Sequence, residues 1–85
     1  MSELRPNETV KEHLESCGLL ESTTKLCIIV ATYSADKTKK DIFCYRGYGD
    51  KVLGSDGSDV LNTIIMDFNG CYDPLTSEYY FEFII

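Results

Sequence analysis

The chain has 85 residues and a formal net charge of −6. Seven acidic and seven basic side chains balance in residues 1–46, whereas residues 47–85 hold seven acidic side chains and Lys51 as their single base. An acidic surface repels nucleic acid and attracts basic partners, so direct nucleic-acid binding is excluded as the expected function. The longest uninterrupted apolar run, residues 26–31, is far shorter than the ~20 residues of a membrane span. We therefore expect one domain, residues 1–85, that binds neither nucleic acid nor membrane.

The N-terminal residues and the cysteines both indicate a cytoplasmic protein. The first residues contain no apolar stretch followed by a small-residue cleavage site, so we expect no secretory signal. Cys17, Cys27, Cys44 and Cys71 are then expected to be reduced thiols, with Cys27 and Cys44 filling positions in a sheet. Their spacings include no Cys-x-x-Cys pair, which argues against a zinc site.

The first predicted element is a short helix over residues 9–18. Thr9 and Glu12 match the capping box that begins a helix, and Gly18 is placed for a left-handed cap at its end. Between these caps a single apolar stripe is formed by Val10, Leu14 and Cys17.

Two strands are predicted next. Residues 24–33 are rich in β-branched side chains and apolar on both faces, which indicates a central position in a sheet. Residues 41–46 form a second strand, and residues 34–40, with three lysines, form the hairpin loop between the two.

The middle of the chain is ambiguous between helix and strand. Residues 47–59 carry four glycines and three aspartates and are predicted to be a loop. The apolar side chains in residues 60–68 recur with helical spacing, so we predict a second helix there, ended by Asn69 and Gly70. The alternative is a strand over residues 63–68 with a hairpin turn at Asn69 and Gly70.

The chain closes with a turn over residues 72–75 and a strand over residues 78–85. Alternation along this strand places Tyr79, Phe81, Phe83 and Ile85 on the core side. The predicted fold is a small two-layer α+β domain of order helix-strand-strand-helix-strand. Its sheet has three or four mainly antiparallel strands, with the helices on one face.

The sequence contains no motif that supports catalysis or a cofactor. The glycine-rich segment before residue 60 lacks the Lys-Ser/Thr pair with which a P-loop holds phosphate. Asp56 and Asp59 flank a glycine as calcium ligands could, but without the alternating acids of an EF-hand. His13 lies one helical turn before Cys17, and we expect it to be an ordinary surface histidine. We therefore predict no enzyme and assign no catalytic or metal-binding residue.

The remaining signal is acidic side chains interleaved with tyrosines in the second half of the chain. Carboxylates can take the place of phosphates on a basic surface, and tyrosine supplies rigid contact area with a polar tip. In size, acidity and lack of a catalytic motif the chain is similar in character to small phage-encoded inhibitors of host nucleases and CRISPR effectors. We therefore expect an inhibitor, acting inside the host cell of a phage, that occupies a basic surface of a larger protein. The candidate contact residues are Tyr48, Asp50, Asp56, Asp59, Tyr72, Asp73, Tyr80 and Glu82.

Two alternatives remain open. The first is an assembly module that homodimerises through the open face or an edge of its sheet, its acidity serving solubility. The second is a calcium-binding or other metal-dependent domain that uses Asp56 and Asp59, or His13 and Cys17.

Overall fold

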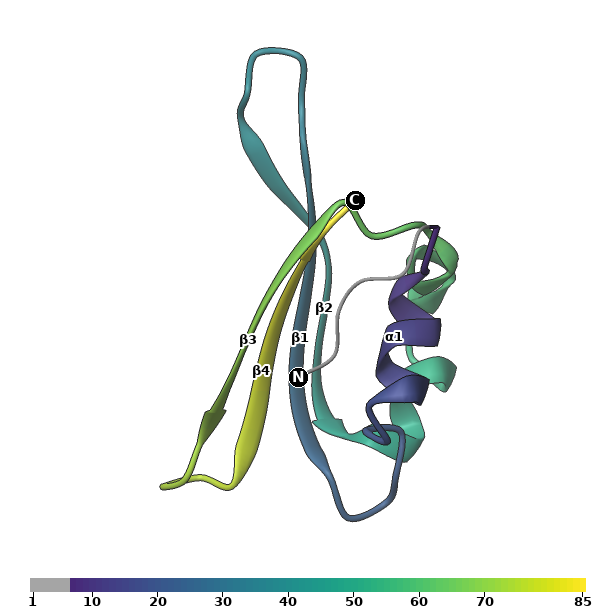
Figure 1. Ribbon diagram of the computed structural model, residues 1–85, viewed down its shortest axis with the longest axis vertical. Coiled ribbons are helices and arrows are strands. Elements are labelled where there is room, and N and C mark those ends of the chain that lie inside the picture. Colours follow the sequence, from purple (N-terminus) through teal and green to yellow (C-terminus); the bar gives the residue numbers. More distant parts are fainter. Residues whose placement is uncertain (1–6) are drawn as a thin grey trace.

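The computed structural model describes residues 7–85 as a two-layer α+β domain, in which a sheet is covered on one face by short helices (Figure 1). This confirms the predicted fold class and the position of the helices on one face. The elements in chain order are α1 (Val10–Ser16), β1 (Lys25–Tyr33), β2 (Lys39–Tyr48), the 3₁₀ helices η1 (Gly49–Gly54) and η2 (Ser58–Asn62), β3 (Asp67–Asp73) and β4 (Glu78–Ile84).

The sheet has four strands in the order β2-β1-β4-β3. β1 pairs antiparallel with β2 and parallel with β4, and β4 pairs antiparallel with β3. The expected central position of β1 is confirmed, but the sheet is mixed because the first and last strands run in the same direction. The chain therefore passes from β2 at one edge to β3 at the other edge through η1 and η2, which cross the face of the sheet (Figure 1).

Both ends of α1 are set by local sequence, as predicted. Thr9 Oγ1 accepts a hydrogen bond from Glu12 N at 3.2 Å, and Thr9 N donates to Glu12 Oε1 at 3.0 Å, which completes the capping box. At the other end Gly18 has φ +69°, and Leu19 N donates to Leu14 O at 3.1 Å in a Schellman motif. The helix is limited to seven residues by these two caps.

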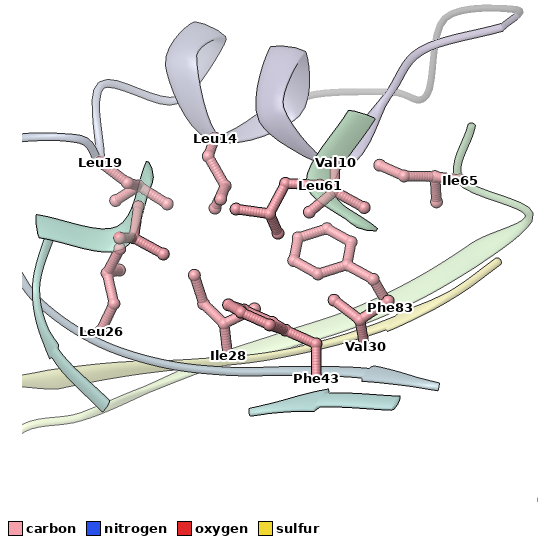
Figure 2. Packing of buried hydrophobic residues seen from close by; sticks show 11 residues of the cluster. Val10, Leu14, Leu19, Leu26, Ile28, Val30, Phe43, Leu61, Ile65 and Phe83 are labelled. Atoms are coloured by element: carbon pink, nitrogen blue, oxygen red, sulfur yellow. The ribbon is translucent and has the colours of Figure 1, made fainter. Parts of the chain in front are cut away.

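The core lies between the helices and one face of the sheet, which we call the inner face (Figure 2). Leu61 of η2 packs from the helical side, and Phe83 of β4 packs from the sheet. The opposite face of the sheet, which we call the outer face, carries the alternate residues of each strand, and no other element of residues 7–85 covers it (Figure 1). The remaining core side chains include Val10, Leu14, Leu26, Ile28, Val30, Phe43 and Val52.

The second helix predicted over residues 60–68 is wrong. η2 ends at Asn62, and Thr63 already has extended backbone angles. The reason is a set of hydrogen bonds to the start of the chain, because Ile65 N donates to Glu8 O at 2.9 Å and Ile64 forms an isolated bridge with Thr9. Leu61 and Ile65 do reach the core, but through a 3₁₀ turn and an extended segment.

The predicted alternative, a hairpin turn at Asn69 and Gly70, is also wrong. Both residues lie inside β3, where Gly70 pairs with Phe81 of β4. The turn occupies residues 74–77, slightly later than the predicted residues 72–75. The loop of the first hairpin is shorter than the predicted residues 34–40, because β2 already begins at Lys39. The strand then extends to Tyr48.

A close approach at Gly49 gives a test of this packing. A Cβ there would lie 1.9 Å from the backbone oxygen of Leu19, whereas a Cβ at Gly54 would meet no described atom within 4 Å. We predict that Gly49→Ala lowers the free energy of unfolding by about 2 kcal/mol or more, because backbone must move to relieve the clash. Gly54→Ala should change it by less than about 1 kcal/mol. Urea denaturation measures both, and equal effects would contradict the described contact between residues 19 and 49.

Candidate functional site

The eight predicted contact residues do not form one surface. Strand pairing places four of them on the outer face, in β2, β3 and β4: Tyr48, Asp73, Tyr80 and Glu82. Tyr72 is 49% exposed on the inner-face side of β3, where its ring lies 4.7 Å from that of Tyr79. The other three lie in or between the 3₁₀ helices that cover the opposite side of the sheet: Asp50, Asp56 and Asp59.

On the outer face, acids of β4 are paired with bases of β2. Arg46 donates from Nε and Nη2 to the two carboxylate oxygens of Glu78, both at 3.0 Å, and Lys39 forms an ion pair with Glu82. β2 and β4 lie on either side of β1, so these side chains reach across it. At Arg46 the intervening β1 residue is the small Cys27, which pairs with Arg46 on one side and Tyr80 on the other.

The Arg46–Glu78 pair shifts the protonation of its members. Hydrogen bonds from the Tyr80 hydroxyl and from Arg46 hold the pKa of Glu78 below its usual range. The same bonds to Glu78 raise the pKa values of Arg46 and Tyr80. Cys27 is half-buried beneath the pair, and its pKa is raised chiefly by burial and also by Cys44 and Glu78. Glu78 is therefore a fixed carboxylate in an ion pair, which removes it from the charge available to a partner.

A shallow apolar hollow of about 230 Å³ lies on the outer face beside this cluster. Its lining comes from β1, β3 and β4, whose outer-face side chains are small or half-buried at this point. The lining includes Cys27, Ile29, Asn69, Cys71, Tyr80 and Glu82.

The acidic excess lies on the other side of the sheet, in the layer formed by residues 7–24 and 49–66, which we call the helical layer. This layer contains seven acidic and two basic side chains, a net charge of −5, whereas residues 25–48 and 67–85 contain six acidic and five basic side chains, a net charge of −1. The two parts of the layer are joined by backbone hydrogen bonds, from Asp50 N to Glu21 O at 3.2 Å and from Val10 N to Thr63 O at 3.2 Å. Its exposed acids are Glu12, Glu15, Glu21, Asp50, Asp56 and Asp59.

Three of these acids, Glu12, Glu15 and Glu21, were not among the predicted contact residues. They belong to the half of the sequence in which acids and bases balance, so the distribution of charge along the sequence does not single them out. They join Asp50, Asp56 and Asp59 only because the bases of that half, such as Lys39 and Arg46, lie mainly in the sheet. The capping box that predicts α1 also identifies Glu12, but as a helix cap.

His13 is buried, with a relative exposure of 1%, so the expected surface histidine is wrong. Its Nδ1 lies 3.0 Å from Glu8 Oε1, and Glu8 is itself buried. The imidazole packs against Phe68 and Phe83, with ring centroids 4.5 and 5.8 Å away. The position beside Leu14 on the inward side of α1 is the signal that could have predicted this burial, and Glu8 satisfies the buried ring nitrogen.

Asp56 and Asp59, the calcium ligands considered in the second alternative, lie on either side of Gly57, which has φ +78° and precedes η2. Both carboxylate-bearing residues are exposed. Within residues 7–85, no three side chains of His, Cys, Asp or Glu are arranged to hold a metal ion. None of the four cysteines, all of which lie within residues 7–85, forms a disulfide.

Comparison of the chain with protein-family models, with curated proteins and with solved structures finds no match. In the described part of the chain, no helix combines the length and the apolar character needed to cross a bilayer. Function is therefore inferred from the charge and geometry of this chain.

The Glu78 cluster predicts how stability depends on pH. Because folding lowers the pKa of Glu78, its contribution is present above the usual carboxyl pKa of ~4.3 and is lost as pH falls through the folded value. We predict that Glu78→Gln is less stable than wild type at neutral pH and that the gap closes in acid. At neutral pH, Glu78→Gln should cost less stability in a Tyr80→Phe background than in wild type, because Tyr80→Phe removes the largest cause of the lowered Glu78 pKa. Denaturation across pH measures it, and a gap independent of pH would contradict this assignment.

Proposed function

We propose that the protein is a small non-enzymatic binding protein that occupies a basic, nucleic-acid-binding surface of a larger protein, as phage-encoded anti-CRISPR or anti-nuclease proteins do. The observation that carries this proposal is the concentration of charge in the helical layer, −5 of the net −6. A layer with a strong excess of negative charge steers a basic partner toward that side of the molecule and repels nucleic acid from it.

The helical layer also offers exposed apolar side chains among its acids. Leu53, Ile64 and Met66 are exposed there, and Met66 is the most open of the three at 76%. Apolar anchors surrounded by charge are typical of interfaces in which the anchors supply affinity and the charges supply specificity and fast association. Methionine suits this use because its flexible side chain adapts to the partner.

The outer face is a weaker candidate than the helical layer for contact with a basic partner. Its carboxylates at Glu78 and Glu82 are already paired with Arg46 and Lys39, so they present little net charge. A basic partner gains less there than at Asp50, Asp56 and Asp59, and the surface proposed for contact is accordingly the helical layer.

Charge reversal on the two sides of the sheet tests the proposal. Asp56→Lys with Asp59→Lys changes the helical layer, and Asp41→Lys with Asp67→Lys makes the same change in net charge within the sheet. We predict that the immobilised wild-type protein captures a protein from a host extract, that the helical-layer variant loses it, and that the sheet variant retains it. Added nucleic acid should compete with capture, and capture should weaken steeply between ~0.05 and ~0.5 M salt.

Two results would contradict the proposal. Equal loss in both variants would show a response to net charge alone, and capture that resists salt and nucleic acid would show a partner surface of another kind.

A second candidate function is homodimerisation through the outer face. It is favoured by the apolar hollow and by the separation of basic from acidic side chains across that face. The bases lie toward β2 and the acids toward β3 and β4. In a face-to-face dimer with its two-fold axis parallel to the strands, β2 of one copy lies over β3 of the other, so opposite charges meet.

This candidate predicts a mass that doubles with concentration over roughly 1 µM to 1 mM. Ile29→Lys, which places a charge beside the hollow, should keep the protein monomeric, whereas Leu53→Lys in the helical layer should not. Analytical ultracentrifugation measures both. A wild-type monomer throughout this range would remove the candidate and leave the first proposal untouched.

A further inference from the structure

Three side chains lie in contact along α1 in the order carboxylate, imidazole, thiol. Glu8 Oε1 lies 3.0 Å from His13 Nδ1, and His13 Nε2 lies 3.8 Å from Cys17 Sγ. α1 itself creates the second contact, because residues four apart lie on the same side of a helix. The first contact depends on the chain preceding Thr9, which places Glu8 within hydrogen-bonding distance of the imidazole.

The contact with Glu8 favours one tautomer of the neutral imidazole. A carboxylate accepts only, so Glu8 selects the form of His13 that carries its proton on Nδ1. Nε2 is then an acceptor directed at the Cys17 thiol, and transfer of the thiol proton to it gives a thiolate beside an imidazolium. This is the relation between base and nucleophile by which a histidine activates a cysteine.

Burial fixes two members of the group and exposure makes the third accessible. His13 and Glu8 have relative exposures of 1% and 5%, and the imidazole packs against the rings of Phe68 and Phe83. Cys17 is exposed. His13 also lies in the last turn of α1, where the helix dipole favours a cation and disfavours an isolated thiolate. A positive charge on His13 would offset this unfavourable effect of the dipole on a thiolate at Cys17.

The backbone around Cys17 favours one class of chemistry. Acyl transfer needs N–H donors aimed at a developing oxyanion. Here the N–H groups of Cys17, Gly18 and Leu19 are donated to the carbonyl oxygens that end α1. Exchange with a disulfide needs a thiolate and access, but no such donors.

We propose that Cys17 is a reactive modification site, activated by His13 and positioned through Glu8, that forms a mixed disulfide with low-molecular-weight disulfides. The Cys17 thiolate attacks one sulfur of the disulfide, a new bond forms between Cys17 Sγ and that sulfur, and the original sulfur–sulfur bond breaks. The leaving thiolate takes the proton that His13 received from Cys17. Cys17 is thereby oxidised, and half of the disulfide is reduced to a free thiol.

The other thiols provide comparisons within the same molecule. Cys44 and Cys71 are exposed, as Cys17 is. Cys27 is half-buried and its pKa is raised, first by burial and then by Cys44, which keeps it in the less reactive thiol form.

The decisive experiment measures the reaction rate of each cysteine with dithiodipyridine, an uncharged disulfide, in the folded protein and in urea. Acid quenching, isotope-coded alkylation and mass spectrometry resolve the four sites. An ordinary exposed thiol reacts no faster when folded than when unfolded. We predict that folding accelerates Cys17 by about 10-fold or more and accelerates none of the other three. A Cys17 that reacts no faster in the folded protein would overturn the proposal.

Variants then test whether His13 and Glu8 cause the faster reaction of Cys17. His13→Gln should reduce Cys17 to the rate of Cys71, and Ser16→Ala, on the same helix, should leave it unchanged. Glu8→Gln should lower the rate by less than His13→Gln, because the ring keeps a hydrogen-bonding partner. A folded His13→Gln protein with the wild-type rate at Cys17 would overturn the proposal. If circular dichroism shows that this variant is unfolded, the wild-type comparison decides alone.

Discussion

The parallel pairing of β1 with β4 determines the path of the chain. It places the last strand beside the first and leaves β2 and β3 at opposite edges of the sheet. The chain between them must then cross the inner face, and residues 49–66 do so as two 3₁₀ helices that complete the layer begun by α1 (Figure 1). Val52 and Leu61 enter the core from this crossover and close it over Ile28 and Phe83.

The same topology redistributes charge. Along the sequence the excess of acidic side chains lies after residue 46, but in space it lies in the helical layer. The bases of β2 form ion pairs across β1 with the acids of β4. The crossover places Asp50, Asp56 and Asp59 over the inner face. The sheet is thereby left almost neutral and the helical layer strongly acidic. Fold and proposed contact surface share this origin, since a crossover on the other face would place those acids beside Arg46.

Local signals in the sequence predicted the parts of the fold that local physics determines. Thr9 and Gly18 set the ends of α1, and the β-branched run that became β1 indicated a central strand. Residues 60–68 were mispredicted because their apolar spacing fits a helix, while hydrogen bonds to Glu8 and Thr9 that no local pattern reveals decide otherwise. The convergence of the acids depends on the crossover, so the sequence could supply individual acids of the helical layer but not the layer itself.

Chemical-shift mapping of the ¹⁵N-labelled protein with a short oligolysine peptide, a model of a basic surface, tests whether a basic partner binds the helical layer. We expect salt-sensitive shifts at the amides of residues 12–21 and 50–59, with residues 78–82 unaffected. Shifts centred on β3 and β4, or spread evenly over the molecule, would contradict it.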